Sequence, residues 1–222
     1  MKRVLVVAAH ADDEVLGCGG TIAKHDGCGD HVSIVFMADG VSSRTYVADG
    51  ELKLRNSAAD AAAAILGIKE IIHLGLPDNR MDSLPLLEIV QKLEPVIEKL
   101  MPDVVYTHHY GDLNIDHRVT CQAVMTACRP IPGASIKEIY SFEVMSSTEW
   151  AVPAMEPFLP NCYVDITEVL SRKMAALKAY SLEMREYPHS RSEEHLEYLA
   201  KYRGGCVGVE AAEAFSTIRL IR

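Results

Sequence analysis

Apolar runs separated by helical or polar stretches recur along most of the chain. Four of them are short, and the first has the β-branched content and the length that suit a strand buried on both faces. A strand, a helix and a second strand in close succession imply a right-handed crossover between neighbouring parallel strands. The pattern therefore predicts an α/β fold built on a mostly parallel sheet. The four predicted strands lie at residues 3–9, 31–37, 69–74 and 103–107.

The stretches between the strands predict helices. Residues 51–66 are rich in alanine and end at Gly67, a residue type that commonly terminates helices. Residues 85–100 have helical spacing, but Pro95 within them predicts a kink or an early break. Further helices are predicted at residues 15–25, 119–128, 165–184 and 194–203, further strands at residues 136–144 and 162–164, and residues 211–221 complete the fold.

Composition narrows the class of protein. A chain of 222 residues, with 49% hydrophobic and 24% charged residues, is long enough for one globular core, so we expect a single domain over residues 1–222. The sequence shows neither a membrane span nor a secretory signal, which predicts a cytoplasmic protein. A net charge of −9 without a basic stripe argues against nucleic-acid binding. The six cysteines form no C-x-x-C pair, which favours reduced thiols over disulfides or a cysteine metal site.

The pentapeptide His10-Ala11-Asp12-Asp13-Glu14 follows the first strand directly. Open α/β sheets bind their ligands at such strand-to-helix corners. Adjacent carboxylates repel each other unless a positive charge lies between them, so a divalent metal bound by His10 and Asp13 explains the cluster. Asp12 is then free to act as a base. The alternative is that the two aspartates only cap the following helix and interact with its dipole, which accounts for the acids but not for His10.

A second polar stretch, residues 108–118, follows the fourth predicted strand and contains three histidines. Because the carboxyl ends of parallel strands meet at one edge of a sheet, we expect it to lie beside the pentapeptide. A metal bound by His10, Asp13 and His117 would keep one position open for water, as in catalytic zinc sites. Zinc lowers the pKa of bound water from 15.7 to about 7, and with Asp12 as the base this arrangement suits attack on an amide or ester carbonyl.

Two motifs, VVAAHADDEVLGCGGT at residues 6–21 and THHYGDLNIDHR at residues 107–118, resemble those of the PIG-L/LmbE family of zinc-dependent de-N-acetylases. The resemblance extends to the alanine-rich helix that contains Arg55 and to residues 212–215, so it spans nearly the whole chain. It implies a Rossmann-like fold with helices on both faces of the sheet. It also implies hydrolysis of an N-acetyl group on an amino sugar or its conjugate.

The resemblance further implies roles for individual residues. The metal ligands would be His10, Asp13 and His117. Asp12 would be the general base, and Asp116 matches an acid that orients the catalytic machinery. Arg55 matches a substrate-binding arginine, although the sequence alone also allows it a place on a solvated helix face.

Two positions depart from the family pattern. Ala11 stands where a proline is usual, which removes no functional group. Asn114 stands where many members have a histidine that acts as a general acid or stabilises an oxyanion, and an amide can donate a hydrogen bond but cannot deliver a proton. Either His108 or His109 then serves as the acid, or Asp12 returns its accepted proton to the leaving nitrogen. We favour the second route, with Asn114 as the oxyanion donor.

The sequence thus predicts a hydrolase that uses Zn²⁺, or another divalent metal such as Fe²⁺, to deacetylate a small acetylated sugar such as a nucleotide sugar or a glycan precursor. Asn114 also allows a non-catalytic, metal-bearing protein that only binds the sugar. A dinucleotide-binding oxidoreductase is disfavoured, because the acidic pentapeptide precedes Gly17 and Gly19 and would repel a pyrophosphate. The number of subunits in any homo-oligomer stays open, as does the choice between a structural acid and a substrate contact for Glu213.

Overall fold

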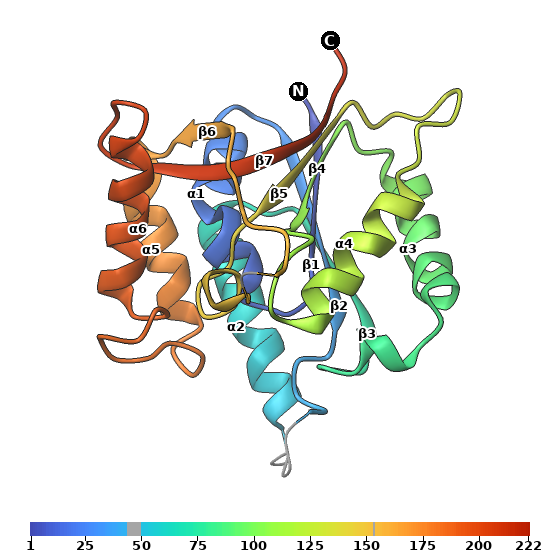
Figure 1. The fold of residues 1–222 in the computed structure, drawn as a ribbon, viewed down its shortest axis with the longest axis horizontal. Coiled ribbons are helices and arrows are strands. Elements are labelled where there is room, and N and C mark those ends of the chain that lie inside the picture. The colour runs from blue at the N-terminus through green and yellow to red at the C-terminus, as the bar shows by residue number, and fades with distance from the viewer. Residues whose placement is uncertain (44–49, 153) are drawn as a thin grey trace.

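The computed structural model describes residues 1–43, 50–152 and 154–222, and its centre is a seven-stranded sheet (Figure 1). The strands are β1 (Arg3–Ala8), β2 (His31–Ala38), β3 (Glu70–Leu76), β4 (Val104–His108), β5 (Glu138–Phe142), β6 (Cys162–Asp165) and β7 (Ala212–Leu220). Their order in the sheet is β3-β2-β1-β4-β5-β7-β6. Strands β1 to β5 are parallel to one another, whereas β7 runs antiparallel to β5 and β6. The predicted α/β fold with a mostly parallel sheet is therefore confirmed.

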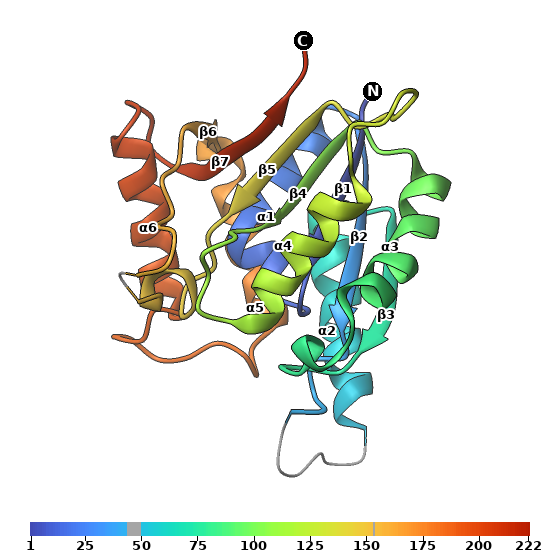
Figure 2. The ribbon, with the colours of Figure 1, turned by 45° about the vertical axis from the view of Figure 1, so that its right-hand side comes forward.

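Helices cover both faces of the sheet (Figures 1 and 2). They are α1 (Asp13–Gly27), α2 (Glu51–Leu66), α3 (Leu86–Leu100), α4 (Ile115–Ala127), α5 (Leu170–Ala179) and α6 (Glu193–Gly205). Side chains of β1 alternate between two cores: Val4 and Val6 pack with α1, α2 and α5, and Leu5 and Val7 pack with α3 and α4. In the part of the chain that the structure describes, none of these helices has the length and apolar composition that a membrane crossing needs.

Two predicted helices differ from the observed ones. Helix α3 continues from Leu86 to Leu100 through Pro95, so the expected early break is wrong. A proline at this position removes one hydrogen bond to the carbonyl of Gln91, and both residues are exposed, so water can satisfy that carbonyl. The helix expected over residues 165–184 is shorter, because β6 ends at Asp165 and α5 ends at Ala179.

A buried ion pair between α5 and β7 also receives hydrogen bonds from α1. Cys18 interrupts the regular helix with φ −147°, and the N–H groups of Gly20 and Thr21 begin its second half. Glu213 on β7 accepts hydrogen bonds from both of these N–H groups, at 2.8 and 2.7 Å. Lys173 on α5 lies 2.6 Å from Glu213, and both side chains are buried. This pair, called here the Glu213 cluster, is satisfied within the fold, so the structural interpretation of Glu213 holds.

Candidate metal centre

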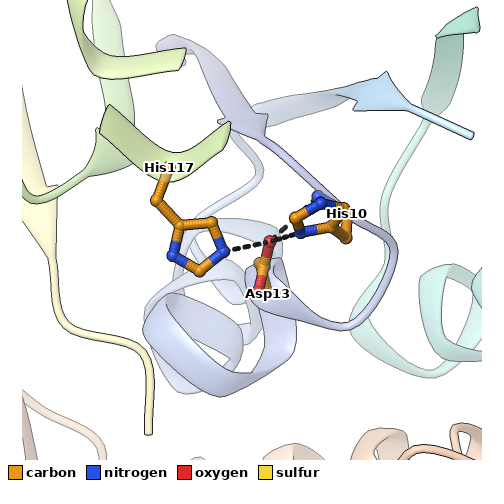
Figure 3. A group of neighbouring side chains, drawn as sticks. All are labelled: His10, Asp13 and His117. Carbon is orange, nitrogen blue, oxygen red and sulfur yellow. Dashed lines mark hydrogen bonds and ion pairs between the residues drawn. The ribbon is translucent and has the colours of Figure 1, made fainter. Parts of the chain in front are cut away.

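The fold brings three polar side chains from two distant segments together at the carboxyl edge of the sheet. His10 follows β1, Asp13 is the first residue of α1, and His117 lies in the first turn of α4 (Figure 3). Asp13 Oδ2 is 3.2 Å from His10 Nδ1 and 3.3 Å from His117 Nε2. All three residues are buried. These three residues, called the His10 triad below, meet as the order of the parallel strands predicts.

The ligand atoms of the triad, and its buried atoms without a hydrogen-bond partner, fit a divalent cation. Two imidazole nitrogens and one carboxylate oxygen, all within 4.8 Å of one another, match the three protein ligands of a catalytic zinc site. Asp13 Oδ1 and His117 Nε2 are buried and have no hydrogen-bond partner among the described residues, and the same is true of Asp12 Oδ1 nearby. Buried polar atoms are rarely left unsatisfied without a reason. A cation and its water would satisfy them.

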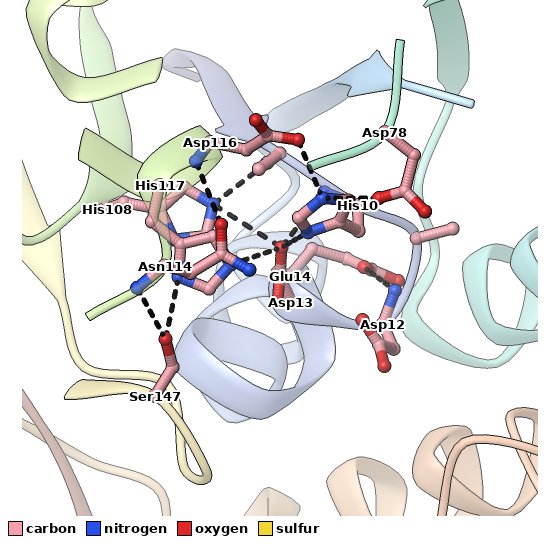
Figure 4. Close-up of polar contacts among 12 residues, drawn as sticks. His10, Asp12, Asp13, Glu14, Asp78, His108, Asn114, Asp116, His117 and Ser147 are labelled. Carbon is pink, nitrogen blue, oxygen red and sulfur yellow. Dashed lines mark hydrogen bonds and ion pairs between the residues drawn. The ribbon is translucent and has the colours of Figure 1, made fainter. Parts of the chain in front are cut away.

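Two carboxylates orient the imidazole of His10. Its Nε2 lies 3.1 Å from Asp78 Oδ1 and 3.2 Å from Asp116 Oδ2, on the ring edge away from Asp13 (Figure 4). Asp116 also accepts a hydrogen bond from the backbone N–H of Asn79 at 2.6 Å, and Asp78 accepts one from the Ser43 hydroxyl at 2.5 Å. Because both carboxylates already have protein donors, we assign them to holding His10 with Nδ1 turned toward Asp13.

A separate network orients His117. Asp112 Oδ1 lies 3.2 Å from His117 Nδ1. The hydroxyl groups of Ser147 and Thr148 both donate hydrogen bonds to the Asp112 carboxylate. This chain of contacts leaves Nε2 of His117 facing Asp13, which is the arrangement of a histidine ligand backed by a carboxylate.

Electrostatics within the triad follow from burial and close charges. Burial raises the pKa of the Asp13 carboxyl, but the His117 and His108 imidazoles offset this and hold the pKa well below its ordinary value. Burial lowers the pKa of His117, yet Asp13 and Asp112 together raise it to about 9. Without a cation, a proton on His117 therefore balances the carboxylate.

Asp12 is held in place through its backbone. Its φ of 125° lies where side chains are disfavoured. The N–H of Asp12 donates to Glu14 Oε2 at 2.9 Å, and the hydroxyl of Tyr180 donates to Glu14 Oε1 at 2.6 Å. Burial raises the pKa of the Asp12 carboxyl, and this effect outweighs the opposing charge of Arg191. The buried Glu14 therefore fixes an unfavourable turn next to Asp13.

The other histidines predicted for the site lie behind it. His108 is fully buried and stacks on His117 at 3.9 Å between ring centroids, and its Nε2 accepts a hydrogen bond from the backbone N–H of Ala9 at 2.8 Å. His109 Nε2 lies 2.8 Å from the carbonyl oxygen of Glu156. Neither ring lines the small polar cavity beside the triad. The acid role of either histidine stays a prediction.

That cavity has a volume of about 200 Å³. Asn114 lines it, and its Oδ1 caps α4 by accepting the N–H of Asp116 at 2.8 Å, while its Nδ2 donates to Asn79. Arg55 also lines it and donates to the carbonyl of Ala11 at 3.0 Å. The described residues around the cavity are His10, Asp12, Gly40, Ser43, Arg55, Asp78, Asn79, Asn114, Glu183 and Arg191.

Several residues in or beside the cavity were not predicted as site residues from the sequence. Asp78 follows β3 at the same sheet edge as His10, so the reasoning that placed the two histidine stretches together could also have found it. Asp112 stands within the second polar stretch, but nothing in its spacing marks it as a partner of His117. Glu183 and Arg191 follow α5 and reach the cavity only through the path of the connecting loop, which no motif indicates.

A protein-family model described as PIG-L: GlcNAc-PI de-N-acetylase matches residues 5–128, which is more than half of the chain. This chain belongs to the PIG-L family. The match covers every residue of the His10 triad and ends before Glu183 and Arg191.

Named relatives agree with the family. The uncharacterized deacetylase YaiS of Escherichia coli is 34% identical over 185 residues, covering 81% of this chain and 90% of the relative. The diacetylchitobiose deacetylase of Thermococcus kodakarensis is 29% identical, covering 96% of this chain and 82% of the relative. The structure of the N,N'-diacetylchitobiose deacetylase from Pyrococcus horikoshii has a TM-score of 0.79 at 25% identity, covering 98% of this chain and 84% of that one. The family, the fold and the expected deacetylase relationship are thus confirmed.

Proposed function

We propose that this protein is a zinc-dependent hydrolase that removes the acetyl group from an N-acetylated amino sugar or its conjugate. The observation that carries the proposal is the convergence of the His10 triad with unsatisfied buried atoms, beside Asp12 Oδ1, which is also unsatisfied. The polar side chains around the adjacent cavity suit a ligand rich in hydroxyl groups. Deacetylases that are named for acetylated sugars support the choice of substrate class.

The triad would hold the cation through one imidazole nitrogen each of His10 and His117 and the carboxylate of Asp13. Bound zinc supplies a water of lowered pKa, about 7 instead of 15.7, and polarises the carbonyl group that is attacked. Asp12 accepts the proton of the attacking water on Oδ1, the carboxylate oxygen that accepts no hydrogen bond from the described residues. It then returns this proton to the nitrogen of the leaving amine.

Asn114 supplies the remaining polar contact. Its Oδ1 is committed to the cap of α4, so Nδ2 is the atom available to the substrate. One hydrogen of Nδ2 points to Asn79 at 3.1 Å, and the second can donate to the oxyanion that develops on the acetyl carbonyl. Arg55, half-buried at the side of the cavity, would contact the sugar.

The test is acetate release from a panel of N-acetylated amino sugars, free, as the disaccharide N,N'-diacetylchitobiose and linked to a nucleotide. We expect Asp12→Asn to lower kcat by about 10² to 10⁴ while the bound metal, measured by elemental analysis, is retained. Asp82→Asn, an exposed aspartate outside the site, is the matched control and should retain full activity. An undiminished rate in Asp12→Asn would exclude Asp12 as the base.

The same assay separates a second candidate function. Because the Oδ1 of Asn114 caps a helix and its amide cannot deliver a proton, the site could hold a metal and a sugar without hydrolysing it. That protein would bind acetylated sugars in calorimetry and release no acetate from any member of the panel. Elemental analysis of the protein as purified also decides between zinc and Fe²⁺.

A further inference from the structure

Arg191 makes the direct side-chain contact to the proposed base. It lies in the loop between α5 and α6, and its Nη1 donates to Asp12 Oδ2 at 2.8 Å. The other end of the guanidinium is also held, since Nε donates to the Ser146 hydroxyl at 2.6 Å. A guanidinium group that is held at both ends fixes the direction of the carboxylate that it contacts.

The backbone of Arg191 is fixed as well. Its N–H donates to His189 Nδ1 at 3.0 Å, and its carbonyl accepts the N–H of Arg185 at 3.3 Å. Ser192, the next residue, is buried and caps α6 by accepting the N–H of His195 at 3.1 Å. The guanidinium therefore extends from an anchored turn, not from a free loop end.

The neighbouring arginine cannot replace this contact. Arg55 Nη2 is 3.8 Å from Asp12 Oδ1, and the same guanidinium is committed to Glu183 at 2.8 Å and to the carbonyl of Ala11. Asp12 thus has one oxygen held by Arg191 and one oxygen without a hydrogen bond among the described residues.

We propose that Arg191 is a positioning residue that fixes Oδ2 of Asp12 and so keeps Oδ1 available to accept the proton of the attacking water. The proposal rests on the hydrolase function given above. It assigns part of the catalytic arrangement to a segment that lies beyond residues 5–128, the part of the chain that the family model matches.

Kinetics of Arg191→Ala and Arg191→Lys test the proposal. We expect Arg191→Ala to lower kcat by about 10², the cost of a misplaced catalytic group, with KM and metal content unchanged. Added guanidinium ion at millimolar concentration should restore part of the lost kcat. Arg191→Lys keeps the charge but cannot bridge Ser146 and Asp12 with one planar group, so its kcat should lie between those of Arg191→Ala and the wild type.

Arg185→Ala is the matched control, because this exposed arginine of the same loop donates from its side chain only to backbone carbonyls among the described residues. Its kcat should equal that of the wild type. A raised KM with unchanged kcat in Arg191→Ala would instead show a substrate contact. A loss of kcat that guanidinium does not restore, together with a lowered unfolding temperature, would show a merely structural role. Either result overturns the proposal.

A crystal structure of Arg191→Ala separates this proposal from the proposed function. Asp12 should adopt a second rotamer or become disordered in the variant, while His10, Asp13 and His117 stay in place. If Asp12 is displaced in the variant and the wild type releases no acetate from any substrate, the positioning role of Arg191 is sustained and the hydrolase function is refuted. An Asp12 that keeps its rotamer without Arg191 refutes the positioning role whatever the activity.

Discussion

Helix α1 touches two buried clusters of charge, and they differ in one respect. The His10 triad lies at its first residue, and the Glu213 cluster lies at its interruption near Cys18. In the Glu213 cluster both carboxylate oxygens have donors: the N–H groups of Gly20 and Thr21 and the ammonium group of Lys173. In the triad, Asp13 Oδ1 and His117 Nε2 make no hydrogen bond with the described residues, although His117 Nε2 lies 3.3 Å from Asp13 Oδ2.

This difference shows how a buried charge can be assigned to structure or to function. Both clusters are nearly inaccessible to solvent, and both place a carboxylate against a nitrogen at short distance. Burial and charge therefore do not distinguish them. The unsatisfied atoms of their charged groups do, because a buried charge without a partner is costly, whereas a neutral hydroxyl oxygen such as Thr21 Oγ1 is unsatisfied even next to the Glu213 cluster.

The largest expected effect on stability comes from removing the cation of the Glu213 cluster. Lys173→Met leaves the Glu213 carboxylate buried without its cation, and we expect the free energy of unfolding in urea to fall by about 3–5 kcal/mol. Adding Glu213→Gln to this variant should recover much of the loss. Lys201→Met removes an ion pair of the same 2.6 Å length on the surface, and we expect no measurable change. Equal losses in the two lysine variants would contradict the comparison.

Metal removal should affect the His10 triad and not the Glu213 cluster. A cation at a hundred times its dissociation constant stabilises the folded state by about 2.7 kcal/mol, and a chelator removes this increment. We expect the wild type and Lys173→Met to lose the same increment in thermal unfolding with and without Zn²⁺. His117→Ala should lose none. A zinc-dependent shift that persists in His117→Ala would place the cation elsewhere.

The smallest effect concerns the support of one ligand. Asp112→Asn replaces the carboxylate that faces His117 Nδ1, and we expect the zinc affinity to fall by about 10- to 100-fold, with the triad itself intact. Competition with a chromophoric chelator measures this change. Asp103→Asn, an aspartate at the opposite end of the sheet, should leave the affinity unaltered. An unchanged affinity in Asp112→Asn would mean that His117 needs no support.

Much of the fold was predictable from the sequence because β1, β2 and β4 are short runs, rich in β-branched residues, that are buried between two layers of helices. Helix ends were less predictable. Pro95 lies on an exposed helix face, where a lost hydrogen bond is tolerated, and the early end of α5 at Ala179 precedes Tyr180, whose side chain turns inward to Glu14. Such contacts depend on tertiary structure and leave no local signal.

The candidate site was likewise only partly predictable from the sequence. The approach of His10, Asp13 and His117 follows from strand order, because each lies where a parallel strand gives way to a helix. Several of the supporting contacts come from loops whose course no local sequence pattern indicates. Ser147 and Arg191 both lie beyond residue 128, and each makes its contact through a single side chain with no repeating pattern.

The last strand of the chain, β7, lies inside the sheet, between β5 and β6, and this position constrains the order of assembly. During synthesis from the N-terminus, β5 keeps an open edge and β6 has no neighbour until residues 212–220 leave the ribosome. Lys173 lacks its ion-pair partner over the same interval, because Glu213 lies on β7. The nascent protein is therefore exposed to edge pairing and chaperone binding until β7 has emerged.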